Sequence, residues 1–310
     1  MSGRLVDFGY ASGWMLLRGV PEPVARAVFR AAADIAWRRD GAGVQQLARN
    51  LRRVVGPQVA AEQLDSLVRE GLRRYARYWM EAFRLPAMSP TEIVARFHFP
   101  QQQVFADAVA AKQGLVIAMP HMGNWDHAGA WASINGWPLT TVAERLRPES
   151  LFRRFVAYRE GLGMEILPLT GGPAPLDVLA ERVRAGRLVP LLADRDLSAR
   201  GVEVTFFGER TRMPAGPATL AIRTGAPLYV VSLWHEPGRT CGSLDPVAVA
   251  DTGSLAQRVR VTTQRVADQM SVRVAEHPQD WHMLQRLWLA DLDRSAAAQR
   301  ELSHAETADG

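Results

Sequence analysis

The segment from Met119 to Gly129 holds the side chains best suited to do chemistry. Its sequence is MPHMGNWDHAG, in which Asp126 follows His121 by five positions. A histidine held by a carboxylate is a general base, because the carboxylate fixes the ring tautomer and stabilises the imidazolium while the other ring nitrogen removes a proton from a hydroxyl. We therefore predict that His121 is a catalytic base and that a turn folds Asp126 back to orient its ring.

On the residues alone, two alternatives stay open. His121 could satisfy a turn while Asp126 caps a helix, which is an ordinary role for Asp in a first turn. Isolated H-x4-D patterns recur by chance, so this pattern by itself favours that structural interpretation. A metal site on His121 and His127 is the weaker alternative, because six positions separate them and the single cysteine, Cys241, does not complete a ligand set.

The neighbouring sequence predicts where these side chains lie. GLVIA at 114–118 is an apolar run typical of a buried strand, and the small residues of 124–134 predict a helix. His121 then lies between the end of a strand and the start of a helix. Loops at the carboxyl ends of parallel strands bind ligands, and a helix N-terminus stabilises negative charge, so this junction suits a reacting group.

Strand and helix patterns alternate through the middle of the chain. Further strand-like runs cover 138–144, 164–170, 187–194, 202–208 and 226–234, and helical patterns at 124–134, 148–162, 173–184 and 217–224 separate most of them. This alternation predicts an α/β fold with a mostly parallel central sheet flanked by helices. No glycine-rich phosphate loop of the Walker or dinucleotide type opens any of these helices.

The N-terminal part predicts helices with basic faces. One helix from Pro23 places apolar residues on a single stripe, Val24, Ala27, Val28, Ala31 and Ile35, with its arginines largely elsewhere. Further helical runs cover 44–54 and 60–83, and the second interleaves arginine with Tyr and Trp, a mixture that suits a lipid headgroup interface. A helical lid packed on the core, with its arginines in water, is the alternative.

The two ends of the chain complete the predicted organisation. Met1–Val20 is apolar but too short and interrupted to span a bilayer, and it lacks the cleavage site of a signal peptide. Ser254–Arg294 is predicted as an amphipathic helical segment. We predict one domain over 1–310, with a helical, membrane-facing region at 1–110, an α/β catalytic core at 111–294 and a flexible tail at 295–310.

Composition limits the class of protein and its partners. A chain of 310 residues with 47% hydrophobic content can bury a large core, and one cysteine excludes an intrachain disulfide framework and fits a reducing compartment. The net charge of +5 predicts an anionic partner, such as a membrane surface or a phosphate-bearing molecule. Zinc-finger spacing and repeated aromatic and basic platforms are lacking, so we expect no nucleic-acid partner.

Several blocks beyond the H-x4-D motif resemble one known family in the same order and spacing. With Glu144-Arg145 and Phe206-Phe207-Gly208, the motif is similar to the lysophospholipid acyltransferase superfamily, which includes lipid A biosynthesis acyltransferases. The blocks that most resemble the actinobacterial phosphatidylinositol mannoside acyltransferases are GYASGWMLLRGVP, MPHMGNWDHAG, TTVAERLRPESLFRRF and LLADRDLSARGVEVTFFGERTRMPAGPA. This resemblance extends to about His282.

The resemblance implies transfer of a fatty acyl group from acyl-CoA to a mannose hydroxyl of phosphatidylinositol mannoside. It implies a peripheral enzyme on an anionic membrane surface at the cytoplasmic face of the plasma membrane, with acyl-CoA as co-substrate and no metal or other cofactor. A sugar hydroxyl is too weakly acidic to attack a thioester unaided, so His121 would remove its proton. Backbone N–H groups near Gly123 and Asn124, or an arginine, would stabilise the oxyanion.

The resemblance also implies substrate-binding residues: Glu144, Arg145, Arg159, Asp194, Arg195 and His282. Carboxylates accept hydrogen bonds from sugar hydroxyls, and an arginine fork pairs with the inositol phosphate or the CoA phosphates. Asp194 and its neighbours could instead support the catalytic pair or form a turn network of their own. Ordinary surface ion pairs are the alternative for the exposed charges, and a packed helix histidine is the alternative for His282.

Two rival functions remain. The first is acyl transfer to a lipid A-type or other glycolipid acceptor with acyl carrier protein as the donor partner, and the same catalytic pair would serve it. The long N-terminal transmembrane anchor that is common in those proteins is not evident in this sequence. The second is a noncatalytic lipid-binding protein, against which the presence of both His121 and Asp126 argues.

Overall fold

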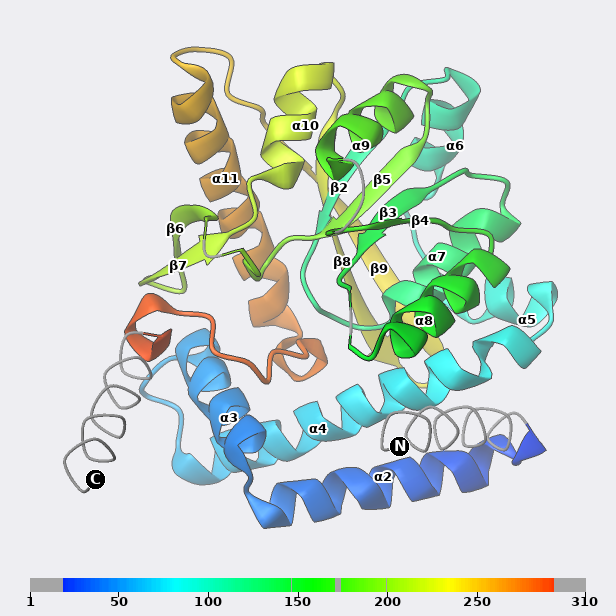
Figure 1. Cartoon of the computed structure of the whole chain (residues 1–310). Coiled ribbons are helices and arrows are strands. Elements are labelled where there is room, and N and C mark those ends of the chain that lie inside the picture. The colour runs from blue at the N-terminus through cyan, green and yellow to red at the C-terminus, as the bar shows by residue number, and fades with distance from the viewer. Residues whose placement is uncertain (1–18, 146, 171–173, 199, 293–310) are drawn as a thin grey trace, which may run out of the picture.

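A computed structural model describes residues 19–145, 147–170, 174–198 and 200–292. Figure 1 shows a central sheet with helices on both faces, and two long helices, α2 (Glu22–Arg39) and α4 (Ala61–Arg84), that pack together across one end of it. The predicted α/β fold with N-terminal helices is confirmed. The segment predicted at Met1–Val20, apart from its last two residues, and the tail predicted at 295–310 lie outside the described residues.

The central sheet has the strand order β1–β9–β8–β2–β5. Its strands are β1 (Phe97–His98), β9 (Arg239–Val247), β8 (Leu228–Glu236), β2 (Leu115–Met119) and β5 (Leu188–Leu192). β2 is parallel to both β5 and β8, and β1 is parallel to β9, whereas β8 and β9 are antiparallel. The sheet is therefore mostly parallel, as predicted, and the carboxyl ends of β2 and β5 lie side by side.

The side chains of β2 alternate between two hydrophobic cores, because successive residues of a strand point to opposite faces. Leu115, Ile117 and Met119 belong to one core, and Val116 and Ala118 to the other. The first core is covered by α5 (Pro90–Ala95), α6 (Gln103–Ala110) and α7 (Trp125–Ile134), and the second by α9 (Pro175–Arg184), α10 (Gly216–Thr224) and α11 (Leu255–Glu276). α8 (Glu149–Gly161) packs beside β4 (Glu165–Pro168).

The apolar stripe predicted on α2 is exposed along its whole length. Val24, Val28 and Ile35 are 52%, 58% and 45% exposed, Ala27 and Ala31 are exposed as well, and the buried residues of α2, Ala25 and Ala33, lie outside the stripe. α3 (Ala42–Val55) and α4 pack against each other and against the segment that follows α11. None of the helices in the described ranges combines the length and the apolar character needed to cross a membrane.

The strands differ from the prediction in three ways. The run at 202–208 is not part of the central sheet: β6 (Val202–Phe206) forms an antiparallel hairpin with β7 (Glu209–Met213). Phe207 and Gly208 both have positive φ, as a two-residue hairpin turn requires. β9 was not predicted, because Gly242 and Pro246 interrupt its apolar pattern. β3 (Thr140–Ala143) and β4 (Glu165–Pro168) form a separate parallel pair.

The helix predicted from Ser254 to Arg294 ends early. α11 stops at Glu276, and His277 leaves the helical conformation directly before Pro278. A proline disfavours the α conformation in the residue before it, which explains the end of the helix. The chain continues through a short 3-10 turn at Pro278–Asp280 into an irregular segment that crosses the loop after β2.

Candidate active site

The loop that carries His121, residues 120–124, connects β2 to α7. Gly123 has a φ of +62°, and a Cβ atom there would lie 2.5 Å from the carbonyl carbon of Leu233 on β8. Only glycine combines this conformation with so close an approach. The side-chain oxygen of Asn124 accepts a hydrogen bond from the N–H of His127 and so begins α7. His121 therefore lies at the strand-to-helix junction, as predicted.

Asp194 holds the ring of His121. It follows β5, the strand beside β2, and its Oδ1 lies 2.5 Å from Nδ1 of His121. Its Oδ2 accepts hydrogen bonds from the backbone N–H of His121 and from the indole N–H of Trp281, both at 2.9 Å. Burial would raise the pKa of Asp194, but the His121 ring and the hydrogen bonds from His121 and Trp281 lower it below its ordinary value.

The second nitrogen of His121 is open. The side chain is 27% exposed, and Nε2 has no hydrogen-bond partner within the part of the chain that the structure describes. With Nδ1–H donated to the ionised Asp194, the lone pair of Nε2 is available to accept a proton. The hydrogen-bond network favours this tautomer, so the pair has the arrangement of a general base and the carboxylate that orients it.

Asp126 does not contact His121, contrary to the expectation from their spacing. Its buried carboxylate accepts hydrogen bonds from the hydroxyl of Tyr78 at 2.9 Å and from Nε of Arg159 at 2.7 Å. Because α7 begins at Trp125, Asp126 is already in the helix, and its side chain points toward α4 and α8 instead of back over the loop. Burial opposes ionisation of Arg159, but the Asp126 carboxylate raises the pKa of that guanidinium above its ordinary value.

The remaining predicted charges divide into two groups. Glu144, after β3, and Arg195, after β5, come together with Oε2 and Nη2 separated by 3.5 Å. Nε of Arg195 is buried and has no hydrogen-bond partner among the described residues. Arg145 turns away to pair with Glu149 at the start of α8, at 2.9 Å on the surface. Glu144 and Arg195 therefore lie at the same end of the strands as Asp194, whereas Arg145 makes a surface ion pair.

His282 lies behind the loop instead of facing open space. Its Nε2 donates to the carbonyl oxygen of Gly123 at 3.1 Å, and its backbone N–H donates to the carbonyl oxygen of His121 at 2.7 Å. Burial lowers the pKa of His282 to about 3. The N–H of Gly123 donates to the carbonyl oxygen of Asp280 at 2.9 Å. Contrary to the prediction, this N–H is therefore not available to stabilise an oxyanion.

Trp281 and Tyr78, the partners of the two carboxylates, were not predicted from the sequence. Each lies far along the chain from the carboxylate it contacts, 87 positions for Trp281 and 48 for Tyr78. The only local signal for Trp281 was its place between a carboxylate, Asp280, and a histidine, His282, in a segment predicted as helical.

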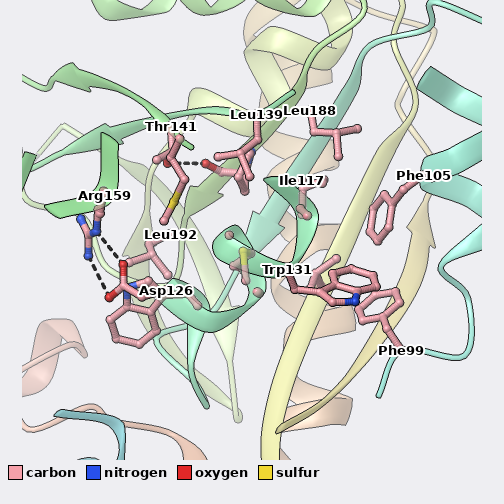
Figure 2. Close-up of a pocket in the computed structure, with 18 of the residues that line it drawn as sticks. Phe99, Phe105, Ile117, Asp126, Trp131, Leu139, Thr141, Arg159, Leu188 and Leu192 are labelled. Atoms are coloured by element: carbon pink, nitrogen blue, oxygen red, sulfur yellow. Dashed lines mark hydrogen bonds and ion pairs between the residues drawn. The ribbon is translucent and has the colours of Figure 1, made fainter. Parts of the chain in front are cut away.

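An apolar pocket opens beside this site (Figure 2). It contains about 830 Å³ of empty space, some of it open to solvent, between α7 and strands β2, β3 and β5. One end lies at Trp125, Asp126 and Arg159, and the ring centroid of Trp125 is 5.8 Å from that of His121. Figure 2 shows Phe99, Phe105 and Trp131 gathered at the other end.

Known acyltransferases match this chain over most of its length. The model of the bacterial lipid A biosynthesis acyltransferase family matches residues 1–290. A phosphatidylinositol mannoside acyltransferase of Mycolicibacterium smegmatis is 50% identical over 293 residues, which cover 94% of each chain. Proteins with the same name from two Mycobacterium tuberculosis strains, CDC 1551 and H37Rv, are 46% identical over 297 residues, which cover 94% of this chain and 92% of theirs.

Proposed function

The chain belongs to the family of bacterial lipid A biosynthesis acyltransferases, and on this premise we propose that it transfers a fatty acyl group from acyl-CoA to a mannose hydroxyl of phosphatidylinositol mannoside. The names of the mycobacterial relatives support this acceptor. The observation that carries the chemistry is the His121–Asp194 pair, in which the partly exposed His121 ring lies 5.8 Å, centroid to centroid, from that of Trp125 in the lining of an apolar pocket.

In the proposed mechanism, His121 is the general base. Its Nε2 takes the proton of the mannose hydroxyl as the oxygen attacks the thioester carbonyl, and Asp194 stabilises the imidazolium that forms. The tetrahedral intermediate collapses as the carbon–sulfur bond breaks, and the imidazolium returns the proton to the departing CoA thiolate. No acyl-enzyme forms, because both substrates are bound together.

The apolar pocket would hold the acyl chain. Ligand pockets are mostly apolar clefts that reach into the core, and this pocket lies between α7 and the sheet and opens to solvent. Its lining is almost entirely hydrocarbon and aromatic, with Asp126 and Arg159 at the end near His121. A fatty acyl chain matches this lining, and its thioester would then lie beside Nε2.

The glycolipid acceptor and the membrane would bind to charged parts of the protein surface. Glu144 and Arg195 lie at the same end of the strands and provide an acceptor and donors for sugar hydroxyls or the inositol phosphate. On α2, exposed Val24 and Val28 lie among exposed arginines, a surface suited to anionic lipid at the cytoplasmic face of the plasma membrane. If the protein fails to sediment with anionic vesicles at low salt, this peripheral membrane contact is wrong.

The test is transfer of radiolabelled palmitate to purified phosphatidylinositol mannoside by the native chain and by His121→Ala. We expect transfer from palmitoyl-CoA by the native chain and a loss of about 10²- to 10⁴-fold in kcat in the variant, the usual contribution of a general base. Matched circular dichroism and unfolding curves would establish that the variant is folded.

The same assay separates the rival functions. Transfer only from palmitoyl acyl carrier protein, or only to a lipid A precursor, would overturn the proposed substrates, although His121 would keep its role. Lipid binding without any transfer would favour a carrier protein. Full activity in His121→Ala would overturn the mechanism itself.

A further inference from the structure

Trp281 is the second side chain that hydrogen-bonds to the carboxylate of Asp194. Both side chains are fully buried, and the indole N–H donates to Oδ2 at 2.9 Å. Oδ2 also accepts the backbone N–H of His121, which leaves Oδ1 directed at Nδ1 of that residue. The two carboxylate oxygens therefore differ in role, because Oδ2 is anchored and Oδ1 holds the imidazole.

The backbone on both sides of Trp281 is bonded to the His121 loop. The carbonyl oxygen of Asp280 accepts the N–H of Gly123 at 2.9 Å, and the N–H of His282 donates to the carbonyl oxygen of His121 at 2.7 Å. Met122 and Trp281 form a β-bridge between these two contacts. The indole is therefore fixed relative to the loop that carries the base, and not only relative to Asp194.

We propose that Trp281 is a positioning residue for acyl transfer, and that its indole N–H keeps Asp194 in the rotamer that orients His121. This inference rests on the proposed function of His121 as the base. The terminal torsion of an aspartate is broad, so a carboxylate that loses one of its two anchors samples other orientations. Partners that orient the histidine ligands of metal sites in the same way are typically worth about 10- to 100-fold in activity, and we expect an effect of this size here.

Trp288 provides a matched control inside the same aromatic cluster. Like Trp281 it is fully buried, and its indole N–H donates to the carbonyl oxygen of Phe206 at 2.9 Å. The centroids of the two indole rings lie 6.1 Å apart, and both rings contact the ring of Phe206. The two tryptophans therefore match in burial and hydrogen bonding, but only Trp281 donates to a member of the catalytic pair.

The experiment replaces each tryptophan in the full chain by β-(3-benzothienyl)alanine, which keeps the bicyclic shape and exchanges the N–H for sulfur. At position 281 we expect kcat to fall by about 10- to 100-fold. The KM values for palmitoyl-CoA and for the glycolipid should stay within about twofold, because the indole contacts neither substrate. Both replacements should lower the thermal stability to a similar extent, but at position 288 we expect kcat to stay within about twofold of native. Trp281→Phe, which also removes the donor, should reproduce the loss of kcat.

The outcomes separate this inference from the function on which it rests. An unchanged kcat at position 281, with His121→Ala inactive, would overturn the positioning role and leave the base in place. Equal losses of kcat at positions 281 and 288 would also overturn it, since a general loosening of the cluster would then explain both. Native activity in His121→Ala would refute the proposed mechanism and this inference together.

Discussion

Two histidine–aspartate pairs in this chain differ in what surrounds the second ring nitrogen. Nδ1 of His121 lies 2.5 Å from Asp194, and Nδ1 of His235 lies 2.8 Å from Asp280. His121 is 27% exposed, whereas the side chain of His235 is fully buried, with Nε2 at 3.3 Å from Glu81. A carboxylate on one nitrogen is common to both, so it is the open second nitrogen that distinguishes the candidate base.

The electrostatics of the buried pair, His235 and Asp280, which we call the inner pair, point to a structural role. Burial opposes protonation of His235, but the carboxylates of Glu81 and Asp280 raise its pKa above the ordinary value. In turn, His235 and Arg77 overcome burial and hold the pKa of Glu81 well below its usual range. This closed group of charges lies behind the His121 loop, where Glu81 accepts a hydrogen bond from the side chain of Asn124. The His121–Asp194 pair is therefore the candidate for chemistry, and the His235–Asp280 pair holds the loop.

Asp194→Asn should have the largest effect, because it removes the charge that orients and stabilises the His121 imidazolium. We expect kcat to fall by about 10³- to 10⁴-fold, the scale seen when an orienting aspartate is lost from a catalytic triad. Asp126→Asn should lower kcat by less than about tenfold, since it acts only on the contacts with Tyr78 and Arg159. The measurement is kcat at saturating donor and acceptor, corrected for the folded fraction. The reverse order of losses would restore Asp126 as the residue that orients the base.

This contrast also shows how far the sequence could predict the site. The place of His121 follows from a local pattern, an apolar strand and then a helix, and both lie within a dozen residues of it. Asp194 is 73 positions away, and it reaches His121 only because β5 lies next to β2 in the sheet. Strand order does not follow from spacing, so the nearer carboxylate, Asp126, was the partner that the sequence favoured.

The same limit applies to the fold. Alternating strand and helix patterns predicted the class and most of the elements, because periodicity is a local property. The prediction failed where contacts between distant parts of the chain decide the structure. β9 forms nine residue pairs with β8 despite its Gly and Pro. The segment around Trp281, predicted as helical, is instead hydrogen-bonded to the His121 loop. Trp281, the second side chain that hydrogen-bonds to Asp194, lies in that segment.

His235→Leu should affect stability more than catalysis. The substitution leaves the fully buried Asp280 without its ionic partner, whereas Glu81, whose side chain is 21% exposed, still pairs with Arg77. Removing one member of a buried ionic pair costs about 3–5 kcal/mol. We expect a loss of this size in the free energy of unfolding, measured by urea denaturation, with kcat of the folded enzyme within about tenfold of native. His98→Ala, at an exposed position, controls for the loss of a histidine. Native stability with abolished kcat would instead place His235 in the chemistry.

The smallest expected effect is the pH dependence of stability that His235 produces. Because its pKa in the folded state is raised above 6.5, the native protein binds this proton more tightly than the unfolded chain. The stabilisation is complete below pH 6.5 and is lost as the pH rises through the folded pKa. The contribution of His235 to the free energy of unfolding should therefore fall as the pH rises above 6.5, by at most about 1.4 kcal/mol per pH unit.

The window between about pH 7.5 and 8.5 isolates this contribution. Burial lowers the pKa of His127, His277 and His282, so these residues destabilise the fold only where the unfolded chain takes up protons, below that window. Burial raises the pKa of Cys241 from 9.0 to about 11, so its contribution begins above the window. Urea denaturation across this range should give a falling free energy for the native chain and for His98→Gln, and a flatter line for His235→Gln. An equal slope in all three would mean that His235 is neutral in the folded state, and the inner pair would then hold the loop by hydrogen bonds without its extra charge.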